Sequence, residues 1–256
     1  MTAYPNVKIN LGLTVLRRRP DGFHDLETLF VPSGAFRDRL DIEPADEFSI
    51  SIMGDKVDWD PRKDLTVKAY ELLKADFDLP PVSISLEKHS PVGAGLGGGS
   101  SDCAFTLRML RDLFSLPLGD YDLARYAARL GSDCAFFVYN RPMFGTGRGE
   151  ILTPFDIDLA GFDLRVEIPQ GVAVSTAEAY RGVLDAKPLG RVPDLRDILG
   201  SPVETWRGRL VNDFEYTIFP LHPEIEALKR RMYDEGAVYA AMSGSGSAVF
   251  GLFRKS

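Results

Sequence analysis

Residues 91–101 read PVGAGLGGGSS, a dense run of glycines between two regular elements. Glycine lets the backbone take positive φ angles and approach a ligand closely. An alternating apolar pattern over 82–86 predicts a strand before the run, and a helical pattern over about 102–114 predicts a helix after it. Ser100 and Ser101 begin that helix, whose first N–H groups lack intrahelical partners and carry partial positive charge. A strand, a glycine loop and a helix start in this order predict a site for a phosphate group.

Two known nucleotide-binding motifs, the dinucleotide fingerprint and the Walker motif, do not match this loop in full. Gly93, Gly95 and Gly98 match the spacing GxGxxG, but the dinucleotide fold also needs a second parallel strand after the helix. Here the segment 115–120, SLPLGD, leads into another helical pattern. The Walker motif needs Lys-Ser or Lys-Thr after its last glycine, and this chain has neither there. A surface loop without function would more often mix its glycines with polar residues. The loop is therefore predicted to bind phosphate in another way.

The composition is that of a globular protein with a substantial core. The chain has 256 residues, 45% of them hydrophobic and 26% charged, which is enough for two domains of ordinary size. No run approaches the roughly 18 apolar residues of a membrane helix, and the start of the chain lacks the basic residues of a secretory signal. The net charge of −7 argues against nucleic acid as a partner. Two cysteines, Cys103 and Cys134, are too few for a disulfide framework, which predicts a cytoplasmic setting.

The first strand is expected over 7–15, where apolar residues alternate with polar or small ones. Lys8 and Asn10 fall on one face of this strand and the apolar residues on the other, so the strand is predicted to be half buried. Lys8 is then an isolated cation on the open face. The segment 17–24, RRRPDGFH, predicts a turn, because Pro-Asp-Gly is strong turn chemistry.

The rest of the chain mixes strands and helices, which indicates an α+β architecture. Further strands are predicted at 38–43, 47–53, 135–139, 163–168, 237–242 and 248–253. Further helices are predicted at about 64–75, 121–130, 194–199, 203–218 and 223–235, with one more opened by the capping box Ser175-x-x-Glu178. Gly131 is expected to cap the second of these in the left-handed conformation. The Gly- and Pro-rich stretch 141–162 predicts a boundary between two domains, 1–152 and 153–256.

Three motifs resemble those of the GHMP kinases, which include galactokinase and the homoserine, mevalonate and phosphomevalonate kinases. PVGAGLGGGSSDCA resembles the family's second motif, PNVKINLGL its first and AMSGSGSAVFGLF its third. Within the family, KINLGL, RPDGFHDLETLF, GSDCAFF and the GRGE of 147–150 are together similar to a member that acts on a cytidine-diphosphate-linked alcohol. The resemblance implies a two-domain α+β fold, with an N-terminal ATP domain like ribosomal protein S5 and a ferredoxin-like C-terminal domain.

The resemblance also implies a reaction. The γ-phosphate of ATP would pass to the 2-hydroxyl of a cytidine-diphosphate-linked methylerythritol, a step of the non-mevalonate route to isoprenoids. Such a transfer needs positioning and charge stabilisation more than covalent catalysis. In the family's pattern Lys8 and Asp133 belong to the active site, with the aspartate acting on the substrate hydroxyl and the lysine beside it. The chain departs from most relatives after this aspartate, where Cys134-Ala135 replaces a Val-Pro pair. Cys134 is interpreted as a small core residue.

For the acceptor, the resemblance implies a pocket for the cytosine base. The ring of Phe23 would stack on the base, and His24 would form a hydrogen bond to its edge. Tyr180 falls where the family has the second aromatic ring, and Thr176 falls where a hydroxyl faces the erythritol chain. Asn10 would hold the polyol, because it shares a strand face with Lys8.

For ATP, the resemblance places the phosphates along the glycine loop and Mg²⁺ near the γ-phosphate, within reach of Ser100 or Ser101. The expected nucleotide contacts are Lys88, Pro91, Val92, Gly93, Ala94, Gly95, Leu96, Gly97, Gly98, Gly99, Ser100 and Ser101. Asp64 lies near the adenine positions but replaces a more usual asparagine. No carboxylate cluster indicates a dedicated metal cage, which suits Mg²⁺ bound mainly by phosphates and water.

Two alternatives stay open at this stage. Another GHMP kinase, such as a homoserine or mevalonate kinase, has no evident use for Phe23, His24 and Tyr180, which need a base to stack on. A nucleotide-binding regulatory protein without catalysis would be expected to lack Lys8 or Asp133, and the chain has both. Small-molecule partners are expected, with neither nucleic acid nor a membrane, and the protein is expected to be a monomer or a homodimer.

Overall fold

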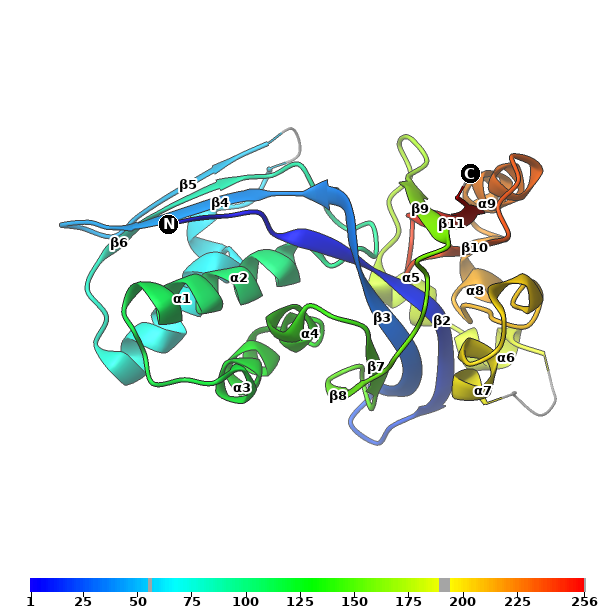
Figure 1. The fold of residues 1–256 in the computed structure, drawn as a ribbon, viewed down its shortest axis with the longest axis horizontal. Helices are drawn as coiled ribbons and strands as arrows, with labels where there is room; N and C mark the ends of the chain where they lie inside the picture. Colours follow the sequence, from blue (N-terminus) through cyan, green and yellow to red (C-terminus); the bar gives the residue numbers. More distant parts are fainter. Residues whose placement is uncertain (55–56, 189–193, 256) are drawn as a thin grey trace. The chain divides into compact units, whose positions relative to one another are not determined.

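The computed structural model describes residues 1–54, 57–188 and 194–255 (Figure 1). Contacts within the chain divide it into two compact units, neither of which is continuous in sequence. The first unit consists of 1–7, 36–92 and 97–141, and the second of 8–35, 93–96 and 142–256. The predicted boundary at residue 152 stays a prediction.

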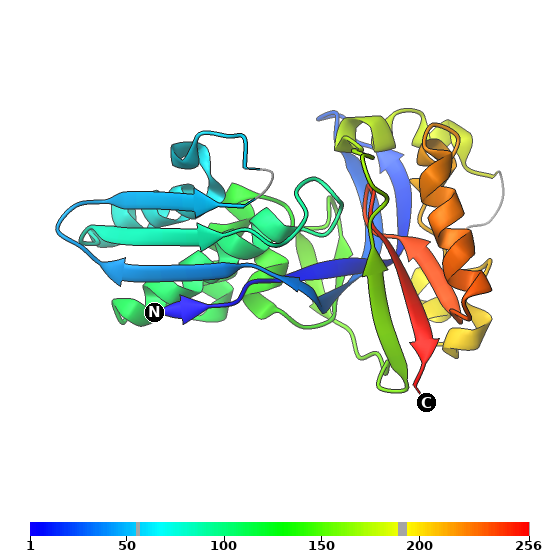
Figure 2. The same cartoon turned by 90° about the horizontal axis from the view of Figure 1, so that it is seen from above.

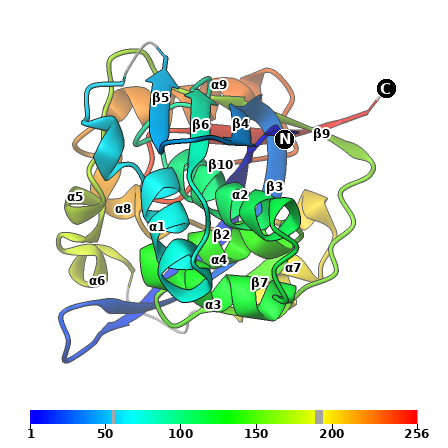
Figure 3. The same cartoon turned by 90° about the vertical axis from the view of Figure 1, so that its left-hand side faces the viewer.

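The first unit contains a four-stranded sheet in the order β1-β4-β6-β5. Its strands are β1 (Thr2–Ala3), β4 (Arg39–Pro44), β5 (Ser49–Met53) and β6 (Val82–Glu87). β4 is antiparallel to β1 and to β6, whereas β5 is parallel to β6. Figure 3 shows β5, β6 and β4 side by side in this order. Val82, Ile84 and Leu86 are buried, as their alternation predicted, and they cover one face of the sheet with apolar side chains.

Helices lie on one side of this sheet. They are η1 (Pro61–Lys63), α1 (Leu65–Phe77), α2 (Gly98–Leu113), α3 (Asp120–Leu130) and α4 (Cys134–Tyr139). Of these, α1 and α2 lie nearer to the sheet, and α3 and α4 lie beyond them (Figures 1 and 2). α1 begins at the N-cap Asp64, whose carboxylate accepts a hydrogen bond from Thr66 N. Asp64 therefore has a structural role as the cap of α1.

The structure corrects three predictions in the first unit. The run 135–139 is part of the helix α4 and not a strand, because a short apolar run shows no period that separates the two. α2 begins at Gly98, four residues before its predicted start, so Gly98 and Gly99 are helical. Gly131 ends α3 with φ −178°, which is extended and not left-handed.

The second unit contains two sheets. One has the order β2-β3-β7-β8, formed by β2 (Asn6–Arg18), β3 (His24–Arg37), β7 (Met143–Thr146) and β8 (Ile151–Pro154). The other is antiparallel in the order β10-β11-β9, formed by β9 (Phe162–Glu167), β10 (Tyr239–Met242) and β11 (Val249–Arg254). The turn predicted at 17–24 joins β2 to β3, but the sequence analysis did not predict the long strand β3 itself.

The helices of the second unit are mostly short. They are α5 (Thr176–Tyr180), α6 (Val183–Ala186), α7 (Leu195–Leu199), η2 (Val203–Thr205), α8 (Glu215–Ile218) and α9 (Pro223–Asp234). α5 begins at the predicted N-cap, where Ser175 Oγ accepts a hydrogen bond from Glu178 N. The continuous helix predicted over 203–218 is wrong, because only η2 and α8 form there. α9 packs on β10 and β11, and Ile225, Leu228 and Met232 bury its apolar stripe in the core (Figure 2).

β2 is buried on both faces over residues 6–15, which corrects the predicted half-buried strand. Val7, Ile9 and Leu11 are buried as expected, and so are Lys8 and Asn10, which are 3% and 2% exposed. Alternation shows which residues share a face but not what covers that face. Among the residues that the structure describes, no helix is long and apolar enough to cross a membrane.

Candidate active site

The glycine loop leaves the end of β6 and leads into α2. Gly93, Gly95 and Gly97 have φ angles of 70°, 75° and 72°, a left-handed conformation that side chains rarely adopt. Gly97 is the N-cap of α2 and has no side chain to cap the first N–H groups. A helix of this length that begins without a side-chain cap presents N–H donors and a positive dipole end to an anion.

The loop 243–247, SGSGS, packs against the middle of the glycine loop within the second unit. Ser243 Oγ donates a hydrogen bond to Gly95 O over 3.2 Å, and Ala248 N donates to Ala94 O over 3.1 Å. A Cβ atom on Gly95 would lie 2.2 Å from Ser243 O, so no larger residue fits there. The third motif of the resemblance thereby contacts the second one.

Lys8 and Asn10 lie together on β2, as predicted, but both are buried. Lys8 Nζ donates to Asn10 Oδ1 over 2.6 Å and to Gly95 O over 3.0 Å. Asn10 Nδ2 in turn donates to Thr28 Oγ1 over 3.0 Å, and Thr28 Oγ1 donates to Gly12 O over 2.6 Å. Lys8 is therefore not an isolated cation on an open face but a buried group held by a chain of hydrogen bonds.

Asp133 lies immediately before α4, in the first unit, and is half buried. Lys8 belongs to the second unit. The structure describes the two residues in their own units, so their pairing stays a prediction.

The predicted acceptor residues lie in the second unit. The rings of His24 and Tyr180 are stacked, with centroids 4.7 Å apart and planes inclined by 20°, and Phe214 packs edge-on against Tyr180. Phe23 is 54% exposed and lies under the guanidinium of Arg148, 4.8 Å from its ring centroid. His24 and not Phe23 thus covers Tyr180. Burial, followed by the charge of Arg18, lowers the pKa of His24, which favours the neutral imidazole.

Thr176 is the first residue of α5 and is exposed. It stands four positions before Tyr180, which places both residues on one side of this short helix. Thr176 is therefore open to a ligand that approaches this side of α5.

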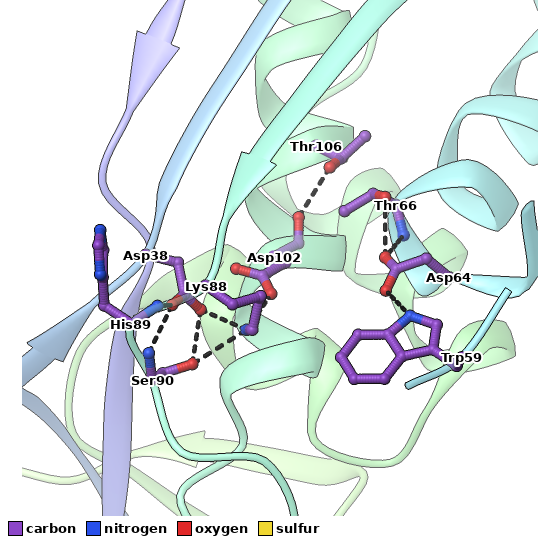
Figure 4. Close-up of polar contacts among 9 residues, drawn as sticks. All are labelled: Asp38, Trp59, Asp64, Thr66, Lys88, His89, Ser90, Asp102 and Thr106. Carbon is purple, nitrogen blue, oxygen red and sulfur yellow. Dashed lines mark hydrogen bonds and ion pairs between the residues drawn. The ribbon is translucent and has the colours of Figure 1, made fainter. Parts of the chain in front are cut away.

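Lys88 lies in a buried charged cluster at the entrance of the glycine loop (Figure 4). Its ammonium contacts Asp38, donates to Ser90 Oγ over 2.9 Å and donates to Asp102 Oδ2 over 2.6 Å. These contacts use the three protons of an ammonium group. Asp64 lies apart from this cluster, where its second oxygen accepts a bond from Trp59 Nε1 over 3.0 Å (Figure 4). A nucleotide contact of Lys88 would therefore come from its backbone.

A cavity of about 450 Å³ lies beside this cluster, at the ends of β5 and β6. Its described lining comprises residues 53–54, 57 and 87–92. Met53 and Val92 are 55% and 50% exposed there, so apolar side chains of the cavity are open to solvent. A cavity of this size, lined by apolar and polar residues, has room for a planar base.

The two thiols are buried in the first unit. A hydrogen bond with Cys134, together with burial, raises the pKa of Cys103 well above its ordinary value. A thiol of this kind stays protonated, so Cys103 acts as a small packing residue. Among the described residues there is no group of three or more His, Cys, Asp or Glu side chains that could hold a metal ion.

Two family models match the chain, "GHMP kinases N terminal domain" over residues 64–141 and "GHMP kinases C terminal" over 204–256. A curated relative from Azobacteroides pseudotrichonymphae, named 4-diphosphocytidyl-2-C-methyl-D-erythritol kinase, is 47% identical over 257 residues. The match covers 100% of this chain and 94% of that protein. The chain belongs to the GHMP kinase family.

Solved structures agree with this assignment. The crystal structure of a 4-(cytidine 5'-diphospho)-2C-methyl-D-erythritol kinase matches this GHMP kinase with a TM-score of 0.79 and 36% identity, over 98% of this chain and 90% of that one. A homoserine kinase from Cytophaga hutchinsonii matches with a TM-score of 0.63 at 18% identity, over 98% of this chain and 86% of that one, which shows a shared fold alone. The α+β GHMP kinase fold expected from the motifs is confirmed.

Several residues at this GHMP kinase's candidate site were missed by the sequence analysis. They are Asp38 and Asp102 beside Lys88, Thr28 beside Asn10, and Arg148 on Phe23. Asp102 follows the glycine motif directly, and Arg148 lies inside the GRGE segment, so both were visible as charges within quoted motifs. Thr28 lies inside the quoted segment RPDGFHDLETLF but is neutral. Asp38 lies between β3 and β4 and comes beside Lys88 through the pairing of β4 with β6, which no local pattern indicates.

Proposed function

We propose that this chain transfers the γ-phosphate of ATP to the 2-hydroxyl of 4-diphosphocytidyl-2-C-methyl-D-erythritol, giving the 2-phosphate and ADP in the non-mevalonate route to isoprenoids. The similarity to relatives of that name over the whole chain carries the proposal. The match spans the whole chain, so it covers the segment 17–24, His24 and Tyr180. The stacked rings of His24 and Tyr180 would have no evident use in a kinase of a small alcohol without a base.

The nucleotide would bind at the glycine loop and the adjoining cavity. The left-handed glycines and the start of α2 support binding of the phosphates by backbone N–H groups. The cavity at the ends of β5 and β6 would take the base. Ser101 Oγ is buried and has no hydrogen-bond partner among the described residues, which fits a hydroxyl that serves a bound Mg²⁺. The metal would neutralise charge on the phosphates.

The buried Lys8 would stabilise charge on the transferred phosphoryl group. Its ammonium is held by Asn10 and by Gly95 O at the glycine loop, so it is fixed before the substrate arrives. Asp133 would orient the 2-hydroxyl and accept its proton as the phosphoryl group leaves ATP. In a loose transition state the orienting role matters more than early removal of the proton.

The acceptor's cytosine would stack against the aromatic rings near β3 and α5. Phe23 is exposed and offers a ring face, while the neutral form of His24 offers both a hydrogen-bond donor and an acceptor to the base edge. Tyr180 and Thr176 lie on α5 and would complete this pocket.

The proposal is tested by incubating the purified protein with ATP, Mg²⁺ and a panel of acceptors. The panel contains the cytidine-diphosphate-linked methylerythritol, other CDP-alcohols, homoserine and mevalonate, and ADP release is followed by a coupled assay. We expect turnover with the CDP-linked methylerythritol, and phosphorus NMR should locate the new phosphate at the 2-position. Faster phosphorylation of homoserine or mevalonate would contradict the proposed acceptor.

A further inference from the structure

The side chain of Asp38 contacts Lys88, His89 and Ser90 in the buried cluster of the first unit. Its Oδ1 accepts hydrogen bonds from His89 N and Ser90 N, each over 2.6 Å. Its Oδ2 accepts from Ser90 Oγ over 2.6 Å and contacts the Lys88 ammonium. Four donors on one carboxylate leave it little freedom, so the backbone of residues 88–90 is fixed immediately before the glycine loop (Figure 4).

The same cluster holds the chain where the loop ends. Lys88 Nζ lies 2.6 Å from Asp102 Oδ2, and Asp102 is on α2. Gly98, the first residue of α2, approaches Ser90 so closely that a Cβ atom would lie 2.4 Å from Ser90 Oγ. The chain therefore leaves the cluster at Ser90 and returns to it at Gly98, which closes the base of the phosphate-binding loop at two points.

The charges within the cluster balance only if one carboxyl group is protonated. Burial raises the pKa of Asp102 well above its usual range, and Asp102 Oδ1 has no partner among the described residues. Burial also acts against ionised Asp38, but the Lys88 ammonium and the bonds from Ser90 outweigh it and lower the pKa of Asp38. With Asp102 protonated, the cluster would contain one cation and one anion, and it would place no net negative charge beside the helix start that would receive phosphate.

A buried ion cluster is weak evidence for stability as such. The cost of removing ions from water is large, and well-packed apolar residues often serve as well. A fixed geometry is what such a network supplies and apolar packing does not. Phosphoryl transfer depends on placing the phosphates correctly, so the loop that binds them needs such a fixed geometry.

We propose that Asp38, Lys88 and Asp102 are positioning residues of the phosphate-binding loop, which they hold through Ser90 and the start of α2. Their side chains contact one another, Ser90 and the start of α2, and Lys88 also lines the adjoining cavity. The proposal rests on the proposed function, because it assumes that this loop binds the phosphates of ATP.

The test compares Asp38→Asn and Asp102→Leu with the wild-type enzyme. Either change removes a charged or accepting partner of Lys88, and we expect kcat/KM for ATP to fall about 100-fold while the acceptor KM stays within about two-fold. Asp102→Asn keeps an accepting oxygen without a charge, so it should restore most of the loss seen in Asp102→Leu. Isothermal titration of each folded protein with ATP and Mg²⁺ gives the affinity without the acceptor.

Lys187→Met is the matched control. Lys187 also pairs with a carboxylate, that of Asp213 over 3.2 Å, and donates to Val15 O, but it does not contact the glycine loop. We expect this variant to lose thermal stability and to keep its ATP affinity. If Asp38→Asn fails to fold, Ser90→Ala removes one hydroxyl from the cluster, keeps its charges, and should weaken ATP binding about ten-fold.

The outcomes separate the two proposals. Wild-type protein that binds no ATP would overturn the proposed function, and this inference with it. Wild-type protein that binds ATP, together with folded Asp38→Asn and Asp102→Leu proteins that bind it equally well, would overturn the inference alone. Selective loss of ATP affinity, with rescue by Asp102→Asn, supports it.

Discussion

The orientation of a single side-chain amide prepares Lys8 for its role. Thr28 Oγ1 donates its only proton to Gly12 O, so it accepts from Asn10 Nδ2. This leaves Asn10 Oδ1 facing Lys8 Nζ, 2.6 Å away. A flipped amide would place an NH₂ group against the ammonium. Thr28 therefore sets the position of Lys8 without contacting it.

Replacing Thr28 with valine tests this chain of hydrogen bonds. Valine has nearly the same shape but lacks the hydroxyl that accepts from Asn10 Nδ2 and donates to Gly12 O in a buried site, and the loss should cost about 1–3 kcal/mol of stability. We expect kcat to fall about 10- to 100-fold because Lys8 is no longer held in place. Thr28→Ser keeps the hydroxyl and serves as the control for lost packing. Equal kcat values in the valine and serine variants would contradict the role given to Thr28.

Lys8 and Asp133 carry the proposed chemistry, and their removal should be far more costly. We expect Lys8→Ala and Asp133→Ala each to lower kcat by about 10²–10⁴-fold, since each loses a group that acts on the reacting atoms. Single-turnover measurements with saturating ATP and acceptor separate this loss from binding. Circular dichroism and thermal melting show whether each variant stays folded. A folded variant with near-normal turnover would remove that residue from the mechanism.

At this scale the sequence predicted which residues share a strand face, but not their surroundings. The alternation over 7–15 correctly put Lys8 and Asn10 together. Their burial under residues near 95 and 244 depends on segments far away in the chain, which no local pattern encodes. The stacking of His24 on Tyr180 likewise joins β3 to α5 and could be expected only from the family resemblance.

Among the elements, the position where α2 begins shows why boundaries are hard to predict. Glycine disfavours helices, so the pattern put the start of α2 after the glycines and serines. In the structure, left-handed Gly97 caps the helix, and Gly98 and Gly99 form its first turn. The reason lies in tertiary packing, because only glycine has room at position 98 beside Ser90. The rest of the α2 pattern, which depends on its own apolar stripe, was predicted correctly.

Gly98 and Gly99 form a matched pair of neighbours for an alanine test. A Cβ atom on Gly98 would lie 2.4 Å from Ser90 Oγ, whereas one on Gly99 meets nothing within 4 Å. We expect Gly98→Ala to lower the free energy of unfolding by about 1–3 kcal/mol, because the bonded Ser90 has no room to move. Gly99→Ala should raise it by about 0.5–1 kcal/mol through helix propensity. Urea denaturation measures both values, and equal effects would show that Ser90 does not restrict Gly98.

For the whole molecule, the order of the motifs was enough to predict the α+β GHMP kinase fold. The organisation into discontinuous units was not visible, since β2 and β3 begin or end in one unit and continue in the other. Residues 93–96 likewise belong to the second unit although their neighbours on both sides belong to the first. A single boundary in the sequence defines two continuous segments, whereas each of these units consists of segments that are separated in the sequence. The strand predicted at 135–139 was wrong for a related reason. Packing against other helices, and not the local period of apolar residues, decides the form of this run.

The stability of the folded protein should depend on pH through Asp102. Its folded-state pKa is raised by burial and by nearby Asp38, although Lys88 opposes the shift. Between the unfolded and folded pKa values, the folded protein holds a proton that the unfolded chain has released. Stability therefore falls as pH rises through this window, by at most about 1.4 kcal/mol per pH unit.

Asp102→Asn isolates this effect, because asparagine does not titrate. The ionisation of Asp38, whose lowered pKa acts in the opposite sense, is present in both proteins and largely cancels in their difference. We expect the difference in unfolding free energy, variant minus wild type, to be smallest near pH 4 and to grow as pH rises toward neutrality. Urea denaturation at a series of pH values, at constant ionic strength, measures it. A difference that stays constant over this range would mean that Asp102 is ionised in the folded protein and that the cluster carries a net negative charge beside the phosphate-binding loop.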